Sequence, residues 1–144
     1  MIHNRSVPSN TLIAHIRYPD VEQAVEWLTK AFGFRENFRY GSPASGAQMR
    51  VLDAWIMVKR AGKGELSPAQ LGYGTQSVTV FLEDVEGHCA CAKAAGAKIV
   101  EEPHETEYGE FQYAAIDFAG HHWLFSRHAR DVKPSDWGAT LARE

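Results

Sequence analysis

Seven histidines are the side chains in this 144-residue chain best suited to acid–base or metal chemistry. They are His3, His15, His88, His104, His121, His122 and His128. Only His15 and His122 are predicted to face a common pocket, since each lies in an alternating segment typical of a strand. Either one could act as a general base or could orient a ligand by hydrogen bonding. No Ser-His-Asp order, nucleophile elbow or glycine-rich phosphate loop accompanies them.

The two cysteines, Cys89 and Cys91, do not suggest chemistry. Their spacing is neither the C-x-x-C redox spacing nor half of a recognisable zinc site. Residues two apart in a helix do not face each other, and this segment is predicted to be helical. We therefore expect two free, partly buried thiols.

The strand faces opposite the predicted core mix aromatic, hydroxyl, imidazole and cationic side chains. A mostly apolar wall with a few placed polar groups is typical of a ligand pocket. The predicted ligand-binding residues are His15, Arg17, Trp55, Met57, Thr79, Phe81, His122 and Leu124. Trp55 and Phe81 offer flat surfaces for a planar ligand, and Arg17 with Lys59 favours an anionic or electron-rich one. The alternative is a half-solvated sheet face with scattered aromatic residues.

The elements that must position these residues repeat along the chain. Asp20-Val21-Glu22 and Asp84-Val85-Glu86 each follow an alternating segment and open a helical pattern. The first helix is predicted to begin after an N-cap at Asp20 and to end at Gly33, and the second to end near Gly96. Predicted strands are 12–18, 34–40, 47–52, 54–60, 76–83, 97–101, 111–117 and 121–128. Both halves therefore have the order β-α-β-β-β.

This pattern predicts one domain over residues 1–144, built from two similar modules. We expect module one over about 10–60, a glycine- and proline-rich linker over 61–75, module two over about 76–128, and a C-terminal tail over 129–144. Each module is small enough to be marginally stable alone, which favours a shared core.

Composition narrows the range of functions. The net charge is −3 and no Lys/Arg cluster occurs, so a nucleic-acid partner is not expected. No run of about 18 apolar residues predicts a membrane span. The first ten residues have no apolar core typical of a secretion signal, and we expect a cytoplasmic protein.

Several ordered motifs resemble the vicinal oxygen chelate superfamily, in its glyoxalase/bleomycin-resistance protein-like branch. Tyr18-Pro19-Asp20 leads into a helix that ends in Ala31-Phe32-Gly33-Phe34, as in that family. Asp117-Phe118-Ala119-Gly120-His121-His122-Trp123 resembles its D-P-x-G-x-x-W hairpin, with Phe118 in place of proline. Tyr108-Gly109-Glu110 and the tail from Arg130 to Gly138 are also similar. The resemblance implies an α+β fold: two βαβββ modules with curved mixed sheets forming a cleft, and helices packed on the outside.

Enzymes of this superfamily usually bind one divalent metal through four strands. Mapped by strand position, the ligands fall on Ile13, Met57, Ser77 and Leu124. None of these is a His, Asp, Glu or Cys, the usual ligands of zinc, iron, manganese or nickel. We therefore expect no metal and no other cofactor. A two-residue shift would bring in His15 and His122, without a placed carboxylate.

Three functions remain open. The first is a metal-free protein that binds a planar, apolar aromatic or heteroaromatic small molecule, with a possible sequestration or resistance role. The second is a lyase, isomerase or dioxygenase-like enzyme that uses His15 and His122, with or without a metal. The third is an interaction module whose mixed face contacts another protein. The resemblance implies a homodimer, and Trp137 either anchors the tail or reaches toward a pocket.

Overall fold

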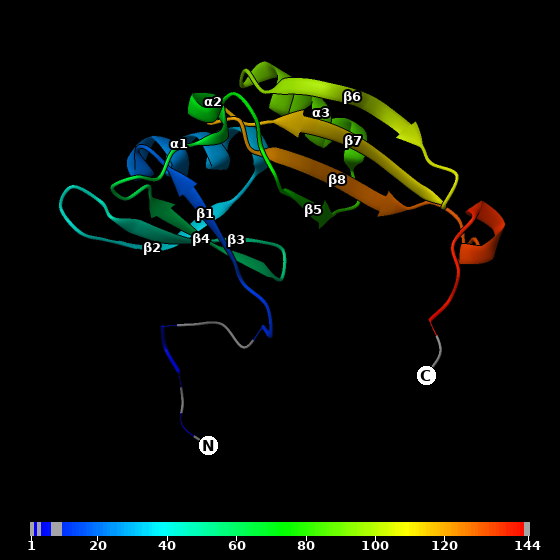
Figure 1. The fold of residues 1–144 in the computed structure, drawn as a ribbon, viewed down its shortest axis with the longest axis horizontal. Helices are drawn as coiled ribbons and strands as arrows, with labels where there is room; N and C mark the ends of the chain where they lie inside the picture. The colour runs from blue at the N-terminus through cyan, green and yellow to red at the C-terminus, as the bar shows by residue number, and fades with distance from the viewer. Residues whose placement is uncertain (1, 3, 7–9, 143–144) are drawn as a thin grey trace.

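The computed structural model describes residues 2, 4–6 and 10–142 and has an α+β fold (Figure 1). Module one contains β1 (Ala14–Tyr18), α1 (Val21–Phe32), β2 (Arg35–Tyr40), β3 (Gly46–Val51) and β4 (Ala54–Arg60). Module two contains β5 (Ser77–Phe81), α3 (Val85–Ala94), β6 (Lys98–Glu105), β7 (Glu110–Ile116) and β8 (His122–His128). Two short helices lie outside this pattern: α2 (Pro68–Leu71) and the 3-10 helix η1 (Pro134–Trp137).

Each module forms one four-stranded mixed sheet. The strand order is β1-β4-β3-β2 in the first sheet and β5-β8-β7-β6 in the second. In each sheet the strand before the helix pairs in parallel with the last strand, and the other pairs are antiparallel. The sheets do not close into a barrel. The predicted fold class, with two repeated modules of mixed sheet, is therefore confirmed.

The helix α1 forms as its sequence predicts. Asp20 accepts a hydrogen bond from the backbone N–H of Gln23 at 3.0 Å, which caps the first turn. Gly33 ends the helix in the left-handed conformation, at φ 76°. The buried stripe of α1 packs on β3 and β4 and contacts α3. The helices thus cover one face of the sheets, and α3 lies behind the second sheet in Figure 1.

One hydrophobic core joins the two modules. Phe32, the last residue of α1, has its ring 4.7 Å from that of Phe125 and 5.5 Å from that of Trp123. Both partners belong to β8, so the end of the first helix is buried against the second sheet. The large side chains at this junction are fully buried, which removes apolar surface of both modules from water.

A buried carboxylate also joins the modules. Asp117, just after β7, accepts hydrogen bonds from the Tyr18 hydroxyl at 2.7 Å and the Trp123 indole at 3.1 Å. Its other oxygen accepts two backbone N–H groups of the following turn, from Ala119 and His121, at 3.0 Å each. Burial and the negative charge of Asp117 raise the pKa of Tyr18 well above its ordinary value. Asp117 therefore fixes both its own hairpin and the end of β1.

The segments between and after the modules are more ordered than the sequence predicts. Within 61–75, Ser67 and Gln70 cap each other reciprocally and start the one-turn helix α2 on Pro68. The tail returns to the loop between β6 and β7, where Trp137 lies 5.6 Å from Tyr108 between ring centroids. The strand predicted at 97–101 extends to Glu105.

In the described part of the chain, no helix has the length and apolar character needed to cross a lipid bilayer.

Candidate functional site

We call the side of the two sheets turned away from α1 and α3 the open face. Alternation along the strands places every predicted ligand-binding residue on it, because the intervening positions are the buried ones. On the first sheet, register pairs His15 with Met57 and Arg17 with Lys59. On the open face, side chains from β1 and β4 therefore lie next to each other in pairs.

The first sheet contributes aromatic rings and cations to the open face. The Arg50 guanidinium lies 5.6 Å from the Trp55 ring centroid. The Lys59 ammonium donates to the Tyr40 hydroxyl at 2.8 Å, and Arg17 pairs with Glu65 of the linker at 3.2 Å. Of these three cations, only Arg17 has a carboxylate partner among the described residues.

The second sheet contributes a more apolar surface. Thr79 pairs with Leu124, and Phe81 pairs with Ser126. Phe81 is 56% exposed, which is high for a phenylalanine and leaves its ring available for contact. The open face of the first sheet is therefore cationic and aromatic, whereas that of the second sheet is dominated by Phe81 and Leu124.

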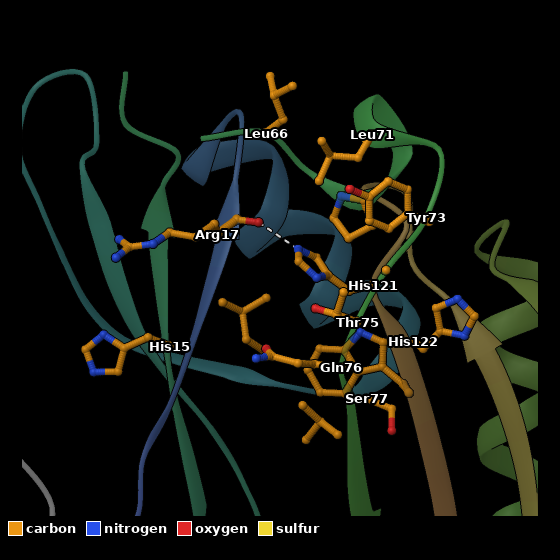
Figure 2. Close-up of a pocket in the computed structure, with 15 residues that line it drawn as sticks. His15, Arg17, Leu66, Leu71, Tyr73, Thr75, Gln76, Ser77, His121 and His122 are labelled. Carbon is orange, nitrogen blue, oxygen red and sulfur yellow. Dashed lines mark hydrogen bonds between the residues drawn. The ribbon is translucent and has the colours of Figure 1, made fainter. Parts of the chain in front are cut away.

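The structure separates the two histidines that the sequence analysis considered together. His15 is on β1 of the first sheet, and His122 is on β8 of the second. Figure 2 shows their side chains pointing in opposite directions from the seam between the sheets. Within one chain, these two imidazoles are not arranged as a chelating pair.

The donor set at the family's metal positions does not fit a divalent metal. Met57 and Leu124 are paired at the centres of their sheets with His15 and Thr79, and Ser77 begins β5. A thioether, a hydroxyl and an isobutyl group offer no anionic or imidazole ligand. Among the described residues, no three His, Cys, Asp or Glu side chains lie close enough together to hold a metal ion.

A cavity of about 210 Å³ lies at the seam between the sheets (Figure 2). We call it the seam cavity. Its walls come from β1, from Gln76 and β5 with the start of β8, and from the linker residues Leu66, Pro68, Leu71 and Tyr73–Thr75. Of the predicted site residues, His15, Arg17 and His122 border it. Figure 2 shows the His15 and Arg17 side chains directed away from it, so they border it mainly with backbone.

His121 lines the seam cavity, although its sequence position did not predict a site residue. Its Nε2 lies 2.7 Å from the Arg17 carbonyl oxygen, which can only accept, so Nε2 carries the proton. The ring also packs edge-on to Tyr18, at 4.9 Å between centroids. Strand alternation assigned His121 to the core side, and the linker path could not be predicted. Only the His121-His122 pair beside a turn marked the position as unusual.

Comparisons with known proteins agree with this geometry. The family model described as "Glyoxalase/Bleomycin resistance protein/Dioxygenase superfamily" matches residues 12–125. No curated protein sequence matches the chain. Among solved structures, TioX from Micromonospora sp. ML1 is 31% identical, with a TM-score of 0.71, over 83% of this chain and 99% of that one.

Two more distant structures share the fold. A glyoxalase/bleomycin resistance protein/dioxygenase family enzyme from Burkholderia phytofirmans PsJN is 17% identical, with a TM-score of 0.63 over 81% of this chain and 96% of its own. The fosfomycin resistance protein FosX from Listeria monocytogenes is 12% identical, with a TM-score of 0.64 over 84% and 94%. With the family model spanning both modules, the chain belongs to the glyoxalase/bleomycin resistance protein/dioxygenase superfamily.

Proposed function

We propose that this protein binds a planar aromatic small molecule on its open face without a metal, in a sequestration or resistance role. The observation that carries the proposal is the pairing of exposed flat side chains with cations on a face that no helix covers. Trp55 and Phe81 offer ring surfaces, and Met57 and Leu124 offer apolar walls. The resistance role is supported by a structural neighbour, FosX from Listeria monocytogenes, which is a fosfomycin resistance protein.

The charges of the first sheet favour an anionic substituent on the ligand. Arg50 and Lys59 lie over the Trp55 and Tyr40 rings, at 5.6 and 5.5 Å. A cation held against a ring is partly shielded from water, which strengthens its attraction for an anion. A carboxylate on a planar ring would meet Arg50 while the ring contacts Trp55, and Lys59 adds positive charge further along β4.

Two copies of the chain are expected to form the complete binding site. One chain leaves Phe81 56% exposed, with Trp55, Met57 and Leu124 only partly covered. Because such a surface is costly to leave in water, a second copy facing it would bury apolar area and enclose a ligand. Sedimentation equilibrium tests this: a dimer that Phe81→Asp dissociates supports it, and a monomer at all concentrations contradicts it.

The cytoplasm is the compartment in which we expect the protein to act. Cys89 is buried and Cys91 is exposed, and both are free thiols. An unpaired, exposed thiol is typical of a reducing compartment.

Calorimetric titration of metal-depleted protein tests the binding function. The ligands are 2-naphthoate, 2-naphthol and 2-naphthylmethylammonium, which share one ring system and differ in charge. We expect 2-naphthoate to bind at least fivefold more tightly than the ammonium compound, because Arg50 and Lys59 face the ligand. Trp55→Ala is expected to weaken 2-naphthoate about tenfold through lost ring contact.

Tyr108→Ala is the matched control, because Tyr108 is an aromatic residue 37% exposed in the loop between β6 and β7. It should leave the affinity for 2-naphthoate unchanged. Equal binding of all three naphthalenes, or equal losses in both variants, would contradict the proposal. A requirement for added zinc, manganese or iron would contradict its metal-free character.

A further inference from the structure

The seam cavity shares three bordering residues with the open face, His15, Arg17 and His122, but the proposed function does not use the cavity itself. Figure 2 shows Leu71, Tyr73, Thr75, Gln76 and His121 gathered around it. Part of its wall is the linker. A linker needs only to connect β4 with β5, but this one also lines a cavity.

Linker residues 66–75, which we call the roof, form a fixed wall of this cavity. Ala69 donates its N–H to the Ala119 carbonyl at 2.9 Å, which binds α2 to the hairpin after β7. Gly120, at φ 90°, allows this approach, since a Cβ there would lie 2.5 Å from the Ala69 nitrogen. The reciprocal cap of Ser67 and Gln70 holds the turn itself. A roof fixed in this way is preorganised, so a ligand would not have to order it.

The roof presents apolar side chains that the fold does not bury. Leu66 is 52% exposed, Leu71 is 46% exposed and Tyr73 is 64% exposed, and all three line the seam cavity. Three large apolar groups converging on one cavity indicate a site for an apolar ring, because covering them removes their surface from water.

Hydroxyl and amide side chains are among the polar groups around the seam cavity. Thr75 and Gln76 have no side-chain partner among the described residues. His121 donates through Nε2 to the Arg17 carbonyl oxygen, and its other ring nitrogen, Nδ1, has no hydrogen-bond partner among the described residues. The nearest cation, Arg17, points away from the cavity and pairs with Glu65. Among the described residues that line it, the cavity therefore offers an ion no unpaired Lys, Arg, Asp or Glu side chain.

We propose that the seam cavity is a second ligand site, which binds an uncharged single-ring molecule carrying an amide or hydroxyl group. The volume of about 210 Å³ sets the size, because a dry cavity of about 150 Å³ accommodates benzene. One ring with a small polar substituent fits this space. The ring contacts Leu66, Leu71 and Tyr73, and the substituent bonds to Gln76, Thr75 or His121.

Benzamide is the probe, with benzoate and benzylammonium as charged counterparts of the same size. We titrate each into ¹⁵N-labelled protein and follow the indole N–H signals by NMR. Trp123 borders the cavity and Trp55 lies on the open face, so the two proposed sites have separate reporters. Saturable shifts at Trp123 with benzamide, at least fivefold weaker with either ion, are expected.

Three variants make the test specific. Gly74 borders the cavity at ordinary contact distance from Pro68, so Gly74→Leu fills the space and should abolish the Trp123 shifts. Leu71→Ala and Gln76→Ala should each weaken benzamide at least fivefold. The controls Leu141→Ala and Gln23→Ala remove exposed residues of the same types elsewhere and should not.

Four results would overturn the proposal. The first is no saturable shift with benzamide, and the second is binding of the ions as tight as that of benzamide. The third is a concentration-dependent dimer that Leu71→Asp dissociates, since a second copy would then cover the roof. Shifts at Trp55 that persist in Gly74→Leu would assign benzamide to the open face and also overturn it. None of these outcomes decides whether 2-naphthoate binds the open face.

Discussion

Replacing Tyr18 with phenylalanine removes a single hydroxyl at the junction of the two modules. That hydroxyl donates to Asp117 at 2.7 Å, and the side chain of Tyr18 is fully buried. A hydrogen bond to a charged acceptor contributes about 1.5–3 kcal/mol. Because Phe preserves the ring packing and Asp117 keeps its other three donors, we expect Tyr18→Phe to lower the free energy of unfolding by about 2 kcal/mol.

Urea unfolding followed by tryptophan fluorescence measures this loss, with the m-value expected to stay constant. Tyr40→Phe is the control, because it also removes one hydroxyl, which accepts from Lys59 at 2.8 Å on an exposed surface. Its expected cost is below about 0.5 kcal/mol. If the two variants lose equal stability, the Asp117 junction does not join the modules energetically as we argue.

Three further perturbations follow from the structure. Burial lowers the pKa of His88 below its usual 6.5, so the unfolded chain binds the proton first, and stability present above about pH 6.5 is lost as the pH falls. Denaturant midpoints from pH 7 to 5 should show this loss, and His88→Gln should flatten it. Gly109 and Gly96 both have positive φ, so alanine strains the backbone at either position. Only at Gly109 would the added Cβ also clash with the backbone, at 2.1 Å from the Arg130 carbonyl oxygen. Gly109→Ala should therefore lower the melting temperature more than Gly96→Ala. Ser67→Ala should cost about 1 kcal/mol through the lost cap of α2, measured by urea unfolding, and no loss would contradict the fixed roof.

Much of the fold could be predicted because several local sequence signals indicate the same secondary structure. The stripe of α1, the cap at Asp20 and the left-handed Gly33 each indicate the same helix, and the structure has it at Val21–Phe32. Strand alternation also predicted which side chains share a face, as the pairing of His15 with Met57 shows.

The seam cavity could not be predicted because long-range contacts create it. Neither the contact of Ala69 with Ala119 nor that of His121 with Arg17 follows from local sequence pattern. The helix α2 was missed because a single turn has no periodicity, although Ser67-Pro68 followed by Gln70 is a recognisable start. The opposite directions of the His15 and His122 side chains likewise depend on how the modules pack, since each residue lies in the sheet of its own module (Figure 2).

The four tryptophans allow a direct test of whether the open face binds the aromatic ligand. In a titration of ¹⁵N-labelled, metal-depleted protein with 2-naphthoate, the account predicts that the indole N–H of Trp55 shifts saturably. The indole of Trp123, which is held by Asp117 at 3.1 Å, and those of Trp27 and Trp137 should stay in place. An unchanged Trp55 signal in the presence of bound 2-naphthoate would contradict the assignment of the open face as the ligand-binding surface.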